Sequence, residues 1–211
     1  MAAGEIQAEI PAGLDEFIAK RVDEIVAKKV EERLAHIDMP KKGPPSMTII
    51  ATKGTLDWAY PPFILASTAA ALGWDVAIFF TFYGLNLLGK DLSQLKVSPL
   101  GNPGMPMKMP FGPEWFRKIN WNIPNIVQGN VPGFESLATT LMKQTIHNTG
   151  VADISDLRAL CIESDVKLIA CQMTVDLFGY SRDDFIPEVA EYCGAAHFLP
   201  MAQKADVSLF I

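Results

Sequence analysis

The chain has 211 residues, of which 49% are hydrophobic and 20% are charged, which is globular composition sufficient for one domain and an extension. Its formal net charge is −6 and its lysines and arginines gather only in short runs such as Lys28-Lys29, which argues against a nucleic-acid-binding protein. Three cysteines are too few for a disulfide scaffold, and the first residues, MAAGEIQAEI, lack the basic and apolar segments of a secretory signal, so we expect a cytoplasmic protein.

Residues 13 to 38 are the first predicted element, an amphipathic helix. Its apolar residues recur at steps of three and four, and charged residues fill the other faces. Steps of four predominate, so we expect the helix to pack on its own domain or on a sister subunit rather than to form a long coiled coil. A proline-rich linker, residues 40 to 45, follows. We therefore divide the chain into residues 1–45, this helix and linker, and residues 46–211, an α/β domain.

Strands and helices alternate after the linker. The pattern predicts a strand over 47–52, and a helix that begins at 56 or 57, with Asp57 as its cap, and ends at Gly73. A second strand covers 75–80, and Phe82 and Tyr83 are a candidate extension of it.

Residues 59 to 88 contain one charged residue, Asp75, and resemble a membrane span by hydropathy alone. Because Gly73 and Asp75 divide the stretch into two elements of different period, a buried helix and a central parallel strand explain it better. Membrane association is an alternative that we do not favour.

Residues 84 to 134 are predicted to be a long insertion with little regular structure. The segment GNPGMPMKMPFGPEWF is dense in proline and glycine and carries Met105, Met107 and Met109. One interpretation is a loop held by its own apolar side chains. The other is a thioether-rich surface for a partner, or a lid over a functional site, and the composition does not choose between them.

The rest of the chain continues the α/β alternation. The predicted elements are helices over 133–147 and 155–164, the second capped by Ser155, a strand over 166–170, a short helix from 172 to Gly179, a helical turn between Ser181 and Pro187, a strand over 188–192, a helix over 195–204 and a strand over 207–211. Such alternation predicts a three-layer α/β fold with a mainly parallel sheet.

Cys171 stands between the strand over 166–170 and the helix that follows it. In open α/β sheets ligands bind at the carboxyl ends of the strands, where this cysteine is expected. The amino end of a helix carries partial positive charge and free N–H groups, which favour thiolate over thiol. Free cysteine is also one of the most often buried residue types. The position nevertheless favours a functional thiol over a core residue.

The other cysteines are weaker candidates. The sequence has no C-x-x-C pair, and Cys161 lies in the preceding helix, near the opposite end of the strand, so we expect a core thiol distant from Cys171. Cys193 and His197 form a conceivable metal set with Cys171. Three dispersed ligands without a fourth are weak evidence for one, so we predict no metal site.

Three segments of the sequence resemble the DsrE/DsrF-like family of sulfur-relay proteins: MTIIATKGTLD, VKLIACQMTVDLFGY and GAAHFLPMAQKADVSLFI. The resemblance covers roughly residues 46 to 211, and the long insertion resembles a larger subgroup labelled peroxiredoxin-like. That label implies a Pro-x-x-x-Thr-x-x-Cys motif, which this sequence lacks, so we expect no peroxidase activity.

The resemblance implies a flavodoxin-like or Rossmann-like fold, a homo-oligomer, and cytoplasmic sulfur trafficking in which Cys171 carries sulfur as a persulfide. It also implies a TusA-like or rhodanese-like partner. Cys161 falls where some relatives carry a second cysteine, so a supporting role for this thiol stays open. Relatives often have glycine where this chain has Cys193, to which we assign no function.

The expected chemistry is thiol exchange without a cofactor. Backbone N–H groups around Gln172 and Met173 are predicted to favour the Cys171 thiolate, and Gly54, beside Lys53 on the first strand's turn, is predicted to line the same edge. The alternative is a non-catalytic binding or scaffold subunit of a sulfur-relay or membrane-associated complex, in which Cys171 is inert.

Overall fold

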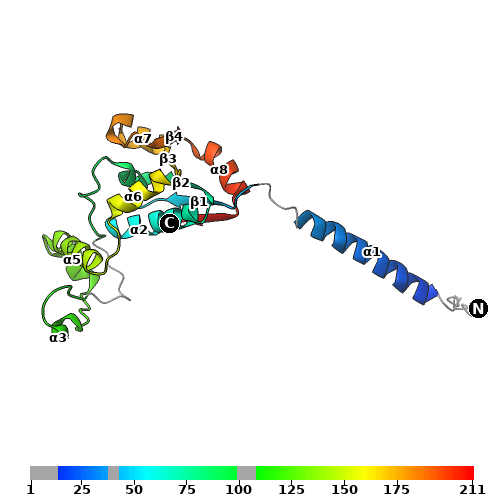
Figure 1. The fold of residues 1–211 in the computed structure, drawn as a ribbon, viewed down its shortest axis with the longest axis horizontal. Helices are drawn as coiled ribbons and strands as arrows, with labels where there is room; N and C mark the ends of the chain where they lie inside the picture. Colours follow the sequence, from blue (N-terminus) through cyan, green and yellow to red (C-terminus); the bar gives the residue numbers. More distant parts are fainter. Residues whose placement is uncertain (1–13, 38–42, 99–107) are drawn as a thin grey trace, which may run out of the picture. The chain divides into compact units, whose positions relative to one another are not determined.

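A computed structural model describes residues 14–37, 43–98 and 108–211 (Figure 1). The chain divides into two units, Met1–Gly43 and Pro44–Ile211. The described part of the first unit is helix α1, Leu14–Ile37. Its apolar residues from Val22 to Val30 are about half exposed, and Arg21 pairs with Glu24 one turn later at 3.3 Å. The predicted helix is therefore present.

The second unit is built on a five-stranded sheet in which every strand pair is parallel. The strand order is β4-β3-β2-β1-β5. The strands are β1 (Ser46–Ala51), β2 (Asp75–Phe80), β3 (Lys167–Cys171), β4 (Val189–Cys193) and β5 (Val207–Phe210). The central strands are buried along almost their whole length, because helices cover the sheet on both sides.

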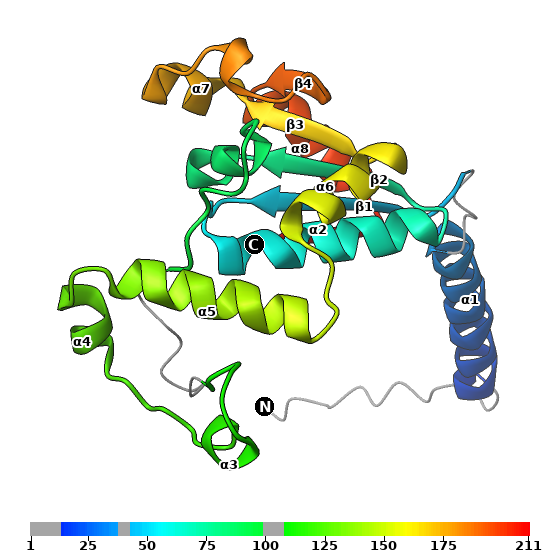
Figure 2. The same cartoon turned by 60° about the vertical axis from the view of Figure 1, so that its left-hand side comes forward.

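Two helices pack on one face of the sheet and one on the other (Figure 2). Helices α2 (Leu56–Ala71) and α6 (Ile154–Glu163) contact each other and enclose the larger apolar core. Helix α8 (Ala195–Lys204) covers the opposite face, where Phe198 stacks on Phe79 at 4.6 Å between ring centroids. The predicted three-layer α/β fold is confirmed.

The predicted extension of the second strand by Phe82 and Tyr83 is wrong. Strand β2 ends at Phe80, and Phe82–Leu88 form a 3₁₀ helix, η1. Phe82 takes a left-handed conformation, with φ of 48°, which turns the chain out of the sheet. The leucines of η1 are buried in the larger core, which explains why hydropathy alone did not separate them from the strand.

Two helix caps also differ from expectation. Helix α6 begins one residue earlier than predicted, and its cap is Asp153, whose carboxylate accepts the Ile154 N–H at 2.5 Å. Thr55 occupies the cap position of α2, and the carboxylate of Asp57 accepts instead the N–H of Ser98 at 3.0 Å. Thr55 and Asp153 have the extended backbone that an N-cap requires, and each lies two residues before the residue predicted as the cap.

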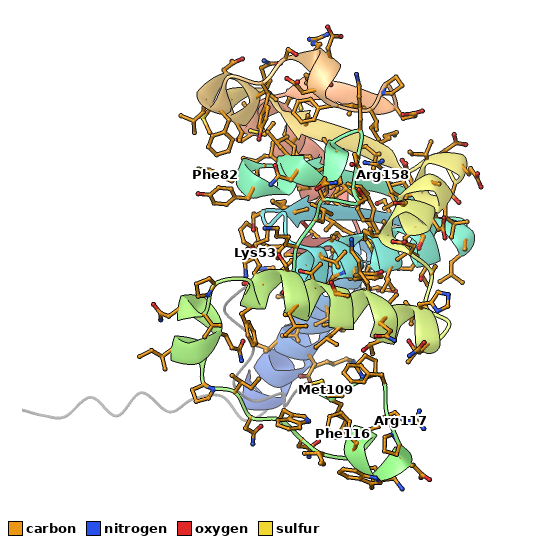
Figure 3. The ribbon with its side chains drawn as sticks, turned by 90° about the vertical axis from the view of Figure 1, so that its left-hand side faces the viewer. Lys53, Phe82, Met109, Phe116, Arg117 and Arg158 are labelled. Atoms are coloured by element: carbon orange, nitrogen blue, oxygen red, sulfur yellow. The ribbon has the colours of Figure 1, made fainter. Side chains whose placement is uncertain are left out.

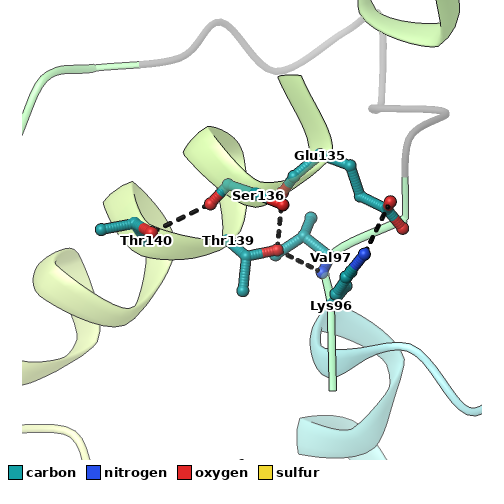
Figure 4. A network of polar contacts seen from close by, with 6 residues as sticks. All are labelled: Lys96, Val97, Glu135, Ser136, Thr139 and Thr140. Atoms are coloured by element: carbon teal, nitrogen blue, oxygen red, sulfur yellow. Dashed lines mark hydrogen bonds and ion pairs between the residues drawn. The ribbon is translucent and has the colours of Figure 1, made fainter. Parts of the chain in front are cut away.

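Helix α5 (Phe134–Asn148), at the far end of the insertion, is joined by polar contacts to the first part of the insertion (Figure 4). The Thr139 hydroxyl accepts the Val97 N–H at 3.0 Å and donates to the Glu135 carbonyl at 2.7 Å. Lys96 pairs with the Glu135 carboxylate at 3.3 Å. These contacts attach the far end of the insertion to its first part.

The insertion contains two short helices, α3 (Glu114–Arg117) and α4 (Asn125–Asn130), within its described part. The ring of Phe116 contacts those of Phe111, Trp115 and Trp121 at centroid distances of 5.7–6.1 Å. This agrees with a segment held by its own apolar side chains. Met109 and Phe116 are labelled in Figure 3, whereas Met105 and Met107 lie outside the described residues.

Arg158 of α6 holds the end of η1 from inside the protein (Figure 3). Its Nη1 donates to the carbonyls of Leu87 at 3.1 Å and Gly89 at 2.5 Å, and the residue is buried. Burial lowers the pKa of this guanidinium, and Glu188 opposes that effect. Arg158 therefore supplies a donor to carbonyls that the end of the helix leaves without one.

Arg158→Met is expected to lower the free energy of unfolding by about 2–3 kcal/mol, because one buried and one part-buried carbonyl lose a charged donor. The measurement is urea unfolding followed by circular dichroism. Lys118→Met, which removes an exposed ion pair with Glu114, is the matched control. It is expected to change the free energy of unfolding by less than about 0.5 kcal/mol. Equal midpoints for the two variants would contradict the proposed role of Arg158.

No helix within residues 14–37, 43–98 and 108–211 is both long and apolar enough to cross a membrane. The apolar stretch over 59–88 folds as part of α2, as β2 and as η1.

Candidate functional site

The carboxyl ends of β1, β2 and β3 meet at one edge of the sheet. Each is followed there by a different element: a turn after β1, η1 after β2 and helix α7 (Gln172–Phe178) after β3. Helix α7 ends at Gly179, whose φ of 69° is a conformation that glycine adopts at low cost. The site is built from these three connections (Figures 1 and 2).

Cys171 lies where β3 ends and occupies the N-cap position of α7. Only 3% of its surface is exposed, and it belongs to the smaller apolar cluster, on the α8 side of the sheet. The strand explains the burial, since the preceding three residues are also buried. The residue is therefore a covered thiol at the edge of the sheet where ligands bind in such folds.

The surroundings of Cys171 lower its pKa. Burial acts in the opposite direction and is the largest single effect, but the hydroxyls of Thr174 and Thr81 and the N–H groups of Thr174 and Met173 together outweigh it. The Cys171 side chain does not form an N-cap hydrogen bond to α7. These amides therefore act as nearby donors that favour its negative charge.

Thr81 and Thr174 connect two of the three elements of the site. Their hydroxyls lie 3.2 Å apart, and the Phe82 N–H donates to the Thr174 hydroxyl at 3.3 Å. Thr174 is completely buried. The sequence interpretation missed both residues. The sequence feature that could have identified them is their position: Thr81 directly follows the buried strand β2, and Thr174 is the third residue of α7.

Gly54 lies on the turn after β1, at the same edge, and packs against η1. A Cβ atom there would lie 2.1 Å from the Tyr83 carbonyl oxygen and 2.8 Å from the Asn86 Cβ. Glycine is required at this position because the two backbones approach closely. The structure thus supplies a packing reason for a residue that the sequence predicted to line the site.

Gln172 and Met173 open helix α7. The Gln172 side-chain amide donates to the Asp176 carboxylate at 2.7 Å, one turn along the same helix. Met173 is 62% exposed. Of this predicted pair, Met173 therefore offers an accessible apolar side chain immediately beside the thiol.

Several large apolar side chains are exposed around α7 and η1, and we call them the α7 surface. Its members are Phe82, Tyr83, Met173, Leu177, Phe178 and Tyr180. The Phe178 ring contacts the three other aromatic rings at centroid distances of 5.9–6.4 Å. Figure 3 labels Phe82 at this edge, on the same side as Lys53, whose Nζ lies 3.2 Å from the centroid of the Trp58 ring.

Cys161 is not brought near Cys171. It is fully buried in the larger core, on the other face of the sheet, and its Sγ donates to the Phe63 carbonyl at 3.5 Å. Burial raises the pKa of this thiol to about 12, with a smaller lowering contribution from the backbone of Ser67. At neutral pH, Cys161 is therefore a protonated core thiol.

Cys193 is the cysteine that the fold brings beside Cys171. The two residues are register partners at the ends of β4 and β3 and share the smaller apolar cluster. Burial, Glu191 and Cys171, in that order, raise the pKa of Cys193. The proximity was not predicted, because the two cysteines are 22 positions apart in the sequence and the strand register decides which residues face each other.

Comparisons with known proteins identify relatives over the second unit. The model of the DsrE/DsrF/DrsH-like family matches residues 44–210. The sulfur carrier protein DsrE2 of Allochromatium vinosum is 54% identical over 165 residues, covering 78% of this chain and 97% of that protein. The uncharacterized protein YrkE of Bacillus subtilis is 30% identical over 164 residues, covering 78% of this chain and 95% of that protein.

Proposed function

Since the chain belongs to the DsrE/DsrF/DrsH-like family, we propose that it traffics sulfur and that Cys171 accepts and passes on sulfur as a persulfide. A relative that is 54% identical carries the name of sulfur carrier, which supports the general role. The observation that carries the assignment to Cys171 is its position at the start of α7 among Thr81, Thr174 and two backbone N–H groups.

The proposed step is a thiol exchange that needs no oxidant. The Cys171 thiolate attacks the outer sulfur of a donor persulfide, the donor S–S bond breaks, and the donor leaves as a thiolate. The product is Cys171-S-SH, in which the proton of the donor persulfide stays on the transferred sulfur. An acceptor thiolate then takes the outer sulfur in the same way and releases the Cys171 thiolate.

The burial of Cys171 sets the kind of donor that we propose. With 3% of the residue exposed, a donor reaches the sulfur only after neighbouring side chains move. A docked protein offsets that cost with contacts of its own, and the α7 surface offers exposed apolar side chains beside the thiol. We propose a TusA-like or rhodanese-like protein as donor or acceptor.

Homo-oligomeric assembly and a cytoplasmic location complete the proposal. One chain has a mass of 23.1 kDa, so a solution mass of that value by light scattering would contradict the oligomer. Recovery of the protein in a membrane or secreted fraction of cells would contradict the location.

The second candidate function is a binding subunit in which Cys171 carries no sulfur. The exposed apolar side chains of the α7 surface favour it, since they suit a docking role with or without chemistry. The two functions differ in one observable. A carrier gains the mass of one sulfur atom, about 32 Da, when it is incubated with polysulfide, and a pure binding subunit does not.

Thr174→Val is expected to slow the alkylation of Cys171 by iodoacetamide about three- to tenfold at neutral pH. Removal of the hydroxyl takes away a group that lowers the Cys171 pKa, so that pKa rises and the reactive thiolate fraction falls. The measurement is the rate of Cys171 modification against pH, read by peptide mass spectrometry in buffer with a chelator.

The midpoint of that pH profile should move to higher pH in Thr174→Val, while the rate well above the midpoint should match that of the wild type. Thr140→Val removes an exposed helix hydroxyl that donates to the Ser136 carbonyl, and it serves as the control. An unchanged midpoint in a folded Thr174→Val protein would show that the hydroxyl does not act on the thiolate.

A further inference from the structure

Three metal-ligating side chains converge where β4 turns into α8. Glu191 and Cys193 are two apart on β4 and therefore share one face of the strand, and His197 lies in the first turn of α8. A carboxylate oxygen, the Cys193 Sγ and an imidazole nitrogen all lie within 4.8 Å of one another. Glu191 Oε2 and His197 Nε2 are 3.1 Å apart.

We infer that Glu191, Cys193 and His197 bind a zinc ion with a fourth coordination position open to solvent. Zinc bonds of about 2.0–2.3 Å to O, N and S in a tetrahedron separate its ligand atoms by roughly 3.3–3.7 Å. Glu191 Oε2 and His197 Nε2 already lie about that far apart, at 3.1 Å, and no pair of the three ligand atoms exceeds 4.8 Å, so side-chain rotations can place the ion between them. This inference goes beyond sulfur transfer at Cys171 and does not depend on it.

The chemical types of the three ligands favour zinc over magnesium and calcium. Thiolate and imidazole are ligands of zinc and other borderline or soft ions, whereas magnesium and calcium take oxygen ligands. A carboxylate disfavours the ionisation of a thiol at this separation, and a divalent cation bound between them favours the thiolate and takes up the charge of both ligands. Three protein ligands with one open position are the arrangement of zinc sites that bind a further small molecule.

The local fold explains how seven consecutive residues supply all three ligands. Gly194 occupies the N-cap position of α8, so the chain turns sharply between the strand and the helix. This turn directs the third residue of the helix back over the end of β4, as the contact between Glu191 and His197 records. The prediction of no metal site weighed Cys171 with Cys193 and His197. It missed Glu191, because a carboxylate in a strand is common.

Cobalt titration of the full chain tests the inference. Protein freed of metal with a chelator is titrated with Co²⁺, which reports tetrahedral thiolate coordination by its visible bands and its near-ultraviolet charge-transfer band. One Co²⁺ is expected per chain, and Zn²⁺ should displace it while Mg²⁺ should not. Cys193→Ser should abolish the charge-transfer band.

Removal of either remaining ligand should weaken zinc binding, measured by competition with a chromophoric chelator. Glu191→Gln and His197→Gln are each expected to lower the zinc affinity by at least roughly 10–100-fold. That is the loss caused by removing a residue that only hydrogen-bonds to a metal ligand, and a ligand itself should matter at least as much. Cys161→Ser and Cys171→Ser are the matched thiol controls and should keep both band and affinity. The inference is overturned by absence of the band, by its loss in Cys171→Ser, or by its survival in Cys193→Ser.

Discussion

Cys171→Ser is expected to abolish persulfide formation while leaving the fold intact. After incubation with polysulfide, the wild-type chain should gain about 32 Da, the mass of one sulfur atom, at the peptide that contains Cys171. The serine variant should show no such gain at that position, because a hydroxyl does not take up sulfane sulfur. Serine also matches the size of cysteine, so little packing is lost at this buried site.

Cys161→Ser is the control that tests the assignment between the two thiols. With a pKa of about 12, Cys161 has a thiolate fraction of roughly 10⁻⁵ at neutral pH and should not react. The variant should therefore gain sulfur as the wild type does. An adduct that survives in Cys171→Ser and vanishes in Cys161→Ser would contradict the proposed site, and no adduct on any cysteine would favour the binding subunit.

The same assay extends to the proposed partner. A persulfidated TusA-like or rhodanese-like protein replaces polysulfide, and the sulfur mass is followed on both chains. Transfer to the wild type and not to Cys171→Ser is the expected result. Failure of the protein donors, together with loading by polysulfide, would leave Cys171 as the carrier and exclude these partners.

Gly84→Ala is expected to lower the free energy of unfolding by about 3 kcal/mol or more, the upper end of overpacking effects. A Cβ at Gly84 would lie 2.2 Å from the Ala51 carbonyl oxygen and 2.8 Å from its carbon. Those atoms belong to the last residue of the interior strand β1, and the oxygen already accepts the Thr81 N–H at 3.0 Å. Neither backbone can retreat without breaking this connection.

Gly129→Ala is the matched control for Gly84→Ala. A Cβ at Gly129 meets nothing within 4 Å, and the residue lies in helix α4, so the change should be neutral or slightly stabilising. Both variants are compared by urea unfolding, and soluble yield is the second readout. A midpoint for Gly84→Ala equal to that of Gly129→Ala would mean that η1 moves away from β1 at little cost.

Local patterns predicted the elements of this chain well. The apolar run before Cys171 and the glycine at 179 define a strand, a cap position and a short helix, and all three are observed. Such features depend on residues within a few positions of each other, so the sequence carries them directly. The errors occur where local signals compete, as at Phe82, where an apolar run continues although the chain has left the sheet.

The sequence by itself determined the order of strands and helices and the position of Cys171 at a strand end that opens a helix. Tertiary structure alone decided what surrounds that sulfur. Strand register brought Cys193 beside it, the turn out of β2 brought Thr81 to Thr174, and Arg158 reached η1 from 69 or more residues away. Hydrophobic periodicity specifies which face of an element is buried, but the packing of distant elements specifies which polar groups meet there.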